Sequence, residues 1–159
     1  MIKMVKKNYN FSFEEGKKYA KAFATNLPVS LKFAVELCRE LKGKKLNKAE
    51  KYLQDIIEFK RYLPLRKYNT KVGHRKGNAT SFTKSGRYPV KLCKAVLKLF
   101  KSVKANADYI GLNMEKLQIE HMFASKGFRR YSHQKQGRIA GKIHRKKSTH
   151  IEVVVSEAA

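Results

Sequence analysis

The 159-residue chain contains 37 Lys or Arg and 12 Asp or Glu, so its formal net charge is +25 at pH 7, which favours a polyanion such as nucleic acid as its partner. The length suits one domain with a hydrophobic core and does not predict a second. No stretch of about 18 apolar residues occurs and the first ten residues lack the apolar core of a signal peptide, so we expect a cytoplasmic protein without membrane insertion.

Residues 1–17 show no clear hydrophobic period, and we treat them as an N-terminal extension of a single domain that spans 18–159. In the stretch KYAKAFATN, which starts at Lys18, small or apolar residues alternate with other residues. An alternation of period two is typical of a β-strand. The domain is therefore expected to begin with a strand.

Two helices are expected next. In SLKFAVELCRELKG, apolar residues recur at helical spacing between Ser30, a suitable N-cap, and Gly43, a suitable stop. In NKAEKYLQDIIEFK, Asn47 is the expected N-cap, Glu50 follows three residues later, and apolar residues again recur along one face. Both patterns predict amphipathic helices.

A long basic loop is expected at 63–88, where Pro, Gly and aromatic residues interrupt the helical pattern. Loops of this length without secondary structure are uncommon in compact domains and are usually functional or ordered by a partner. Between Glu58 and Asp108 the chain has 14 Lys or Arg and no acidic residue. The positive charge is therefore concentrated in one region.

A third helix is expected from Pro89, with apolar residues on one face and a row of lysines on the other. The lysines are Lys91, Lys94, Lys98, Lys101 and Lys104. Cys38 and Cys93, the two cysteines, each fall inside an apolar helical pattern and form no C-x-x-C pair. We interpret both as reduced core residues and not as zinc ligands or redox centres.

Two further strands are indicated by alternating stretches. In LQIEHMFAS, Leu117, Ile119 and Phe123 alternate with Gln118 and Glu120, and in HIEVVVS, Ile151, Val153 and Val155 alternate with Glu152. They flank 127–147, GFRRYSHQKQGRIAGKIHRKK, which has eight Lys or Arg and no acidic residue. We therefore predict a hairpin whose base belongs to the core sheet and whose outer part, 124–148, projects as an arm reaching roughly 40 Å. The expected fold is α+β, with three helices packed on a small antiparallel sheet and a long projecting β-hairpin.

A two-stranded ribbon of this length is marginally stable alone, so the arm needs a partner that supplies negative charge. Aromatic residues interleaved with cations suit stacking on unpaired bases while the cations hold phosphates. The candidate RNA-binding residues are Arg66, Lys67, Tyr68, Lys71, His74, Arg75, Lys76, Lys84, Arg87, Lys126, Arg129, Arg130, Lys135, Arg138, Lys142, Arg145, Lys146 and Lys147.

Catalysis has little support in the sequence. The five histidines form no H-x-x-x-H pair, the acidic residues are scattered, and neither G-x-G-x-x-G nor G-x-x-x-x-G-K-[ST] occurs. We expect no cofactor, no metal and no enzymatic activity.

Two alternatives to a structural RNA-binding role stay open on composition alone. An architectural DNA-binding protein could insert a basic β-ribbon into a groove, as minor-groove benders do. An RNA-processing enzyme is the other alternative. The third helix presents lysines and not the Arg, Asn and Gln that read base edges, which favours binding directed by RNA structure.

With these residues placed, the chain resembles the universal large-subunit ribosomal protein family numbered twenty-two in bacteria and seventeen in eukaryotes. The resemblance runs from about Ala20 to Ser156 and rests on a helix opened by Ser30 and closed by LKGKK, on KAEKYL, on ANA at 105–107, and on GR followed by HIEVVVSE. The inserted LPLRKYNTKVGHRKGN and SGRYP are similar to the archaeal and eukaryotic branch.

The resemblance implies a structural constituent of the large subunit that binds ribosomal RNA, supports assembly and contacts neighbouring ribosomal proteins near the tunnel exit. The hairpin is implied to line the exit tunnel and so to meet the nascent polypeptide. Its tip is implied to help form the tunnel constriction with the ribosomal protein family numbered four. The implied tip residues are Phe128, Arg129, Arg130, Tyr131, Gln136, Gly137 and Arg138.

Overall fold

A computed structural model describes residues 9–76, 82–138 and 140–158. The parts of the expected extension, loop and arm that fall on 1–8, 77–81 and 139 lie outside the described residues, as does 159. The helices are α1 (Leu31–Leu41), α2 (Leu46–Ile57) and α3 (Val90–Ile110). The strands are β1 (Ala20–Leu27), β2 (Leu63–Pro64), β3 (Gly86–Arg87), β4 (Leu117–Lys126), β5 (Tyr131–His133), β6 (Ile143–Arg145) and β7 (Thr149–Glu157).

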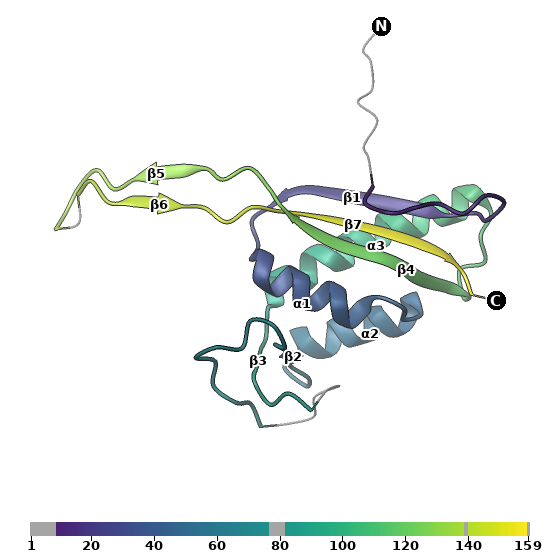
Figure 1. The fold of residues 1–159 in the computed structure, drawn as a ribbon, viewed down its shortest axis with the longest axis horizontal. Coiled ribbons are helices and arrows are strands. Elements are labelled where there is room, and N and C mark those ends of the chain that lie inside the picture. Colours follow the sequence, from purple (N-terminus) through teal and green to yellow (C-terminus); the bar gives the residue numbers. More distant parts are fainter. Residues whose placement is uncertain (1–8, 77–81, 139, 159) are drawn as a thin grey trace, which may run out of the picture.

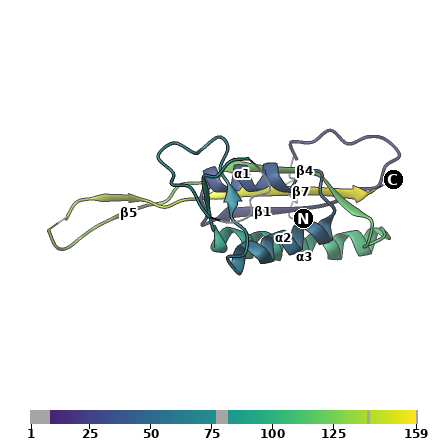
Figure 2. The same ribbon diagram turned by 90° about the horizontal axis from the view of Figure 1, so that it is seen from below.

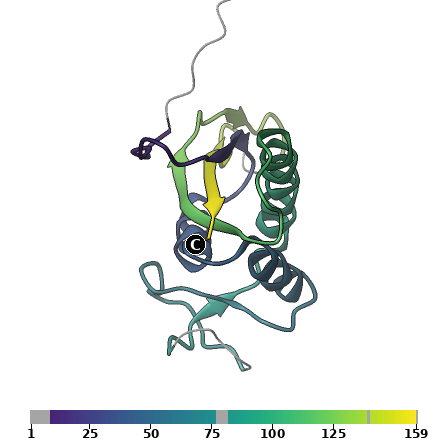
Figure 3. The ribbon, with the colours of Figure 1, turned by 90° about the vertical axis from the view of Figure 1, so that its right-hand side faces the viewer.

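An antiparallel sheet in the order β1-β7-β4 organises the domain, so β7 is its central strand. α3 packs against β1, α1 packs against β4, and α2 packs on α3. All three helices lie on one side of the sheet (Figure 3). The expected α+β class, with three helices on a small antiparallel sheet, is confirmed.

The hydrophobic core lies between the sheet and the helices. From β7, Ile151, Val153 and Val155 are fully buried, and they form one cluster with Leu53 of α2 and Phe100 of α3. Burying an apolar side chain of this size stabilises the fold by about 1.5–3 kcal/mol. The alternation read from the sequence therefore marks the core-facing residues of β7 correctly.

Residues 9–19 lie over the opposite face of the sheet (Figure 3). The ring of Phe11 lies 5.3 Å from that of His121. Glu152 Oε1 accepts hydrogen bonds from His121 Nε2 at 3.0 Å and from the backbone N–H of Asn10 at 3.1 Å. This cover explains why Glu152, the polar member of the β7 alternation, is itself only 4% exposed.

A β-bulge in β4 changes which side chains face the core. Ile119 of β4 pairs with Val155 of β7, but His121, two residues farther along β4, pairs with Val154, only one residue away on β7. β4 therefore contains one extra residue here, and the side chains that follow it switch faces. The expectation that Phe123 shares the inward face of Leu117 and Ile119 is therefore wrong. Phe123 is 40% exposed and Met122, at 5%, points into the core instead.

The start of α2 differs from the sequence prediction. Lys45 is the N-cap and Asn47 lies in the first turn, so Asn47 is not the cap. Lys45 is held in an extended conformation by its bridge to Gln118 of β4, and the fully buried Leu46 begins the helix. Tertiary packing therefore outweighs the capping preference of Asn.

The segment 63–88 is not a loop without secondary structure. Its ends pair as β2 and β3, and His74 and Ser85 form an isolated bridge farther out. Leu63 and Leu65 are fully buried. The described part of this basic loop thus has a buried base, and it lies beyond α1 and α2 on the side away from the sheet (Figures 1 and 3).

The arm continues from β4 and β7 and projects from one end of the sheet (Figures 1 and 2). Where it leaves the domain, Asn26 of β1 holds both of its strands. Asn26 Oδ1 accepts hydrogen bonds from the backbone N–H of Phe128 at 3.1 Å and from Ser148 Oγ at 3.0 Å. Asn26 adopts a positive φ of 48°, a conformation that Asn tolerates better than most residues.

Gly127 leaves the space that this contact needs, and Gly127→Ala tests it. An added Cβ would lie 2.4 Å from Ser148 Oγ and 2.8 Å from Asn26 Oδ1, so atoms must shift. We expect a loss of about 1–3 kcal/mol of stability and faster amide exchange at Phe128. Gly73→Ala is the control, because its Cβ would meet nothing within 4 Å. Equal melting and exchange for the two variants would contradict the contact.

The two cysteines are buried, as expected, and burial raises the pKa of each thiol to about 12. At pH 8 the thiolate fraction is roughly 10³-fold below that of an ordinary cysteine. We therefore predict that iodoacetamide labels Cys38 and Cys93 only after unfolding in guanidinium chloride. Lys51→Cys, on the exposed side of α2, is the positive control and should label in the native protein. Rapid native labelling of Cys38 or Cys93 would contradict the packing.

Candidate nucleic-acid interface

The arm carries its cations on an open ribbon. Its two short strands pair from Tyr131 opposite Arg145 to His133 opposite Ile143. The guanidinium carbon of Arg145 lies 5.9 Å from the centre of the Tyr131 ring. All nine predicted cations of the arm are exposed: Lys126, Arg129, Arg130, Lys135, Arg138, Lys142, Arg145, Lys146 and Lys147.

The described residues in the turn of the arm are 134–138, 140 and 141. The N–H of Gln134 donates to the carbonyl of Lys142 at 3.0 Å, and the N–H of Gly141 donates to that of Gln134 at 2.9 Å. Gly137 and Gly141 both have positive φ, which glycine adopts without strain. Of the seven expected tip residues, Gln136, Gly137 and Arg138 therefore lie in the turn, whereas Phe128, Arg129, Arg130 and Tyr131 lie in the stem nearer the sheet.

Two buried carboxylates on α1 anchor the start of the basic loop. Glu36, 1% exposed, accepts hydrogen bonds through Oε1 from the backbone N–H groups of Lys67 at 2.6 Å and Tyr68 at 3.0 Å. Glu40, 7% exposed, accepts a charge-assisted bond from Arg66 Nη2 at 2.6 Å. The sequence pattern did not identify Glu36 and Glu40 as functional residues. Their spacing of four, next to the apolar stripe of α1, was the available signal, because it places them on adjacent turns of the same helix face.

The remaining loop candidates divide into exposed and internally bonded side chains. Arg87 Nη1 donates to the carbonyls of Gly86 at 2.9 Å and Gly73 at 3.3 Å, so this cation partly serves the loop itself. The guanidinium carbon of Arg75 lies 5.9 Å from the centre of the Tyr88 ring. The exposed candidates are Lys67, Lys71, His74, Arg75, Lys76 and Lys84.

A groove of about 500 Å³ lies where the loop, α1 and the base of the arm meet. Tyr68 of the loop and Ser30 at the start of α1 line it together with Ser148 of the arm. Its cations are Lys32, Lys126, Arg129, Arg145, Lys146 and Lys147. We call it the arm-base groove. It brings predicted residues of loop and arm together, and it adds Lys32, which the helical pattern did not distinguish from other surface lysines.

The lysine row of α3 does not join the arm-base groove. Lys91, Lys94 and Lys98 line a separate groove of about 470 Å³ beside β1. Lys104 Nζ contacts Glu50 Oε2 of α2 at 2.7 Å, so the face is not wholly available as the sequence suggested. The cationic surface is therefore divided among the arm, the loop and α3.

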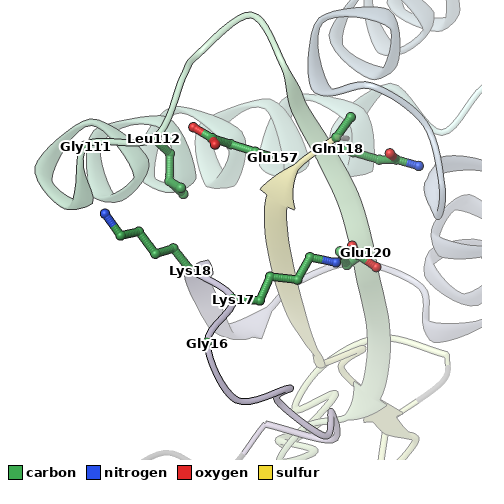
Figure 4. A pocket seen from close by; sticks show the side chains of 9 residues that line it. Gly16, Lys17, Lys18, Gly111, Leu112, Gln118, Glu120 and Glu157 are labelled. Atoms are coloured by element: carbon green, nitrogen blue, oxygen red, sulfur yellow. Dashed lines mark hydrogen bonds and ion pairs between the residues drawn. The ribbon is translucent and has the colours of Figure 1, made fainter.

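A larger cavity of about 710 Å³ lies at the other end of the sheet, between the approach to β1, the end of α3 and the end of β7 (Figure 4). Lys17 Nζ donates to Glu120 Oε1 at 2.6 Å, and Ser156 Oγ donates to the same oxygen at 2.7 Å. These hydrogen bonds lower the pKa of Glu120, and the bond to Glu120 raises that of Lys17. Because charges of both signs pair here, this cavity does not suit a polyanion.

Within 9–76, 82–138 and 140–158, no group of three or more His, Cys, Asp or Glu side chains is arranged to hold a metal ion. Over the same ranges, no helix combines the length and the apolar character needed to cross a bilayer.

Comparison with known proteins gives one consistent result. The family model described as ribosomal protein L22p/L17e matches residues 22–156. The large ribosomal subunit protein uL22 of Methanocaldococcus jannaschii is 42% identical over 159 residues, which covers 99% of both chains. The proteins of the same name from Archaeoglobus fulgidus and Methanoculleus marisnigri are 44% and 39% identical, covering 78% and 91% of this chain and 79% and 94% of theirs.

Glu36→Ala tests whether the buried carboxylate anchors the basic loop. The change removes a charged acceptor for two backbone N–H groups, so we expect a loss of about 2–4 kcal/mol in unfolding free energy. Glu36→Gln keeps the acceptor oxygen and should lose less. Glu58→Ala, at an exposed ion pair with Lys60, should change stability by less than about 0.5 kcal/mol. Urea titrations measure the loss of stability, and amide exchange at Lys67 and Tyr68 measures the loosening of the loop. The anchoring role would be contradicted if the loss did not decrease from Glu36→Ala to Glu36→Gln to the Glu58→Ala control.

Proposed function

Since this chain belongs to the ribosomal protein L22p/L17e family, we propose that it is a structural constituent of the large ribosomal subunit in the cytoplasm, where it binds ribosomal RNA and supports subunit assembly. Membership confirms the resemblance indicated by the sequence motifs, and the archaeal relatives agree with the expected branch. It also confirms the expectation of a non-enzymatic protein, because this is a family of ribosomal components.

The observation that carries the RNA-binding proposal is the exposed arm, which has nine cations and no acidic residue from Lys126 to Lys147. Its strands β5 and β6 contain three residues each, and their side chains face solvent almost throughout. Repulsion among like charges works against such a ribbon, and little burial offsets it. A phosphate backbone along the arm removes the repulsion and releases counterions.

We further propose that the arm lines the exit tunnel for the nascent polypeptide, with a protein of the ribosomal family numbered four as neighbour. Gln136, Gly137 and Arg138 are the candidates for the tunnel wall, because they lie in the terminal turn. Phe128, Arg129, Arg130 and Tyr131 are better suited to RNA beside the base of the arm. The family supports this role, and the length and exposure of the arm are compatible with it.

Arg129→Glu combined with Arg130→Glu tests the role of the arm. Both side chains are exposed, so we expect circular dichroism and melting to stay unchanged. Incorporation into large subunits, measured by sedimentation after a high-salt wash, should fall at least about tenfold, because charge reversal turns two phosphate contacts into repulsions.

Lys48→Glu with Lys51→Glu is the matched control, since it makes the same charge change on the exposed side of α2. Normal incorporation of the arm variant, or equal loss in the control, would contradict the role of the arm. Preference of the wild-type protein for duplex DNA over large-subunit RNA at physiological salt would favour the architectural DNA-binding alternative.

A further inference from the structure

We propose that the arm-base groove binds a sharply folded segment of RNA backbone and holds at least two phosphate groups at once. This inference rests on the proposed RNA-binding function and assigns a site within it. It names the groove as the place where one RNA feature meets α1, the loop and both strands of the arm.

The positive charge that lines the groove favours an anionic ligand. Among the residues that the structure describes, six cations and no Asp or Glu line the groove, although the same protein pairs cations with carboxylates elsewhere, as at Lys17 with Glu120. The six come from three separate parts of the chain: Lys32 from α1, Lys126 and Arg129 from the outgoing strand, and Arg145 to Lys147 from the returning strand. Their convergence raises electrostatic repulsion, which a bound anion relieves.

The number and placement of the cations favour more than one phosphate. A single phosphodiester carries one negative charge, whereas six positive charges surround about 500 Å³. Lys32 belongs to α1 and the other five cations belong to the arm, so a ligand that contacts both elements must present negative charge to each of them. A folded RNA backbone does so where it reverses direction.

Tyr68 adds a polar and aromatic wall to the groove. Lys32 Nζ lies 5.5 Å and Lys67 Nζ lies 5.8 Å from the centre of its ring. The hydroxyl of Tyr68 can donate to a phosphate oxygen, and the guanidinium groups of Arg129 and Arg145 suit bidentate contact with phosphate. Because the cations continue from the groove along the arm, one polyanion can follow both surfaces, which favours RNA over an isolated acidic peptide.

Occupation of the groove would also fix the direction of the arm. Ser148 lines the groove and donates to Asn26, which also holds the N–H of Phe128. A ligand that joins Lys32 of α1 to Lys146 of the arm therefore acts across the same junction that Asn26 holds from within. RNA at this point and the Asn26 contact would together set the angle of projection.

The test is filter binding of the full-length protein to large-subunit ribosomal RNA from Methanocaldococcus jannaschii over a salt series. The double variant Lys32→Ala with Lys146→Ala removes one cation that α1 contributes to the groove and one that the arm contributes. We expect the slope of log K against log salt to fall in magnitude by about 1.4, since each single-strand phosphate contact contributes about 0.7, and affinity at physiological salt to fall at least tenfold. Hydroxyl-radical footprinting should show loss of protection at one bend in the RNA and retained protection elsewhere.

Two matched variants separate the site from general charge loss. Lys48→Ala with Lys51→Ala removes two cations from α2 and should leave slope and footprint unchanged. Lys135→Ala with Lys142→Ala removes two from the outer arm and should erase protections distant from that bend. If the groove variant behaves like the α2 variant while the outer-arm variant loses affinity, the groove inference fails and RNA binding stands.

Two other outcomes would also overturn the inference. If the groove variant keeps its RNA affinity but loses binding to polyglutamate, the groove takes an acidic peptide. If the wild-type protein binds duplex DNA more tightly than this RNA at physiological salt, the proposed function fails together with the inference.

Discussion

Repulsion among Lys and Arg side chains is the constraint on which the arrangement of this domain depends, because a net charge of +25 opposes a compact state. The apolar layer between sheet and helices supplies the cohesion. Several carboxylates lie where other segments attach to that layer: Glu36 and Glu40 at the base of the loop, Glu152 beneath residues 9–19, and Glu50 beneath Lys104. The scarce negative charge thus holds segments in place, and 16 of the 37 Lys and Arg residues lie on the loop (seven) and the arm (nine).

The same division explains how the arm can be long and still have a defined origin. Its outer part has little packing of its own, but its base continues β4 and β7, and Asn26 joins both strands there. Gly127 permits the close approach that this contact requires. The sheet therefore sets where the arm begins, and the negative charge of a partner is left to order the rest.

Periodic features could be predicted from the sequence because they depend on neighbours along the chain. The apolar stripe of α3 and the alternation in β7 are of this kind, and so is the basic arm. Features set by other segments could not be predicted: the bulge in β4, the cap of α2 at Lys45 instead of Asn47, and the burial of Glu36. At the candidate site, charge composition identified loop and arm, but Lys32 and Asn26 acquire their roles only through tertiary contact.

The central position of β7 has a mechanical consequence. The returning strand of the arm runs directly into β7, which is hydrogen-bonded along its length to β1 on one side and to β4 on the other. A pull along the arm acts on β4 and β7 together, so it loads the β1–β7 hydrogen bonds in shear, and many of them must yield at once. The anchorage of the arm should therefore resist tension far better than the arm itself resists bending, which suits a lever clamped rigidly at one end.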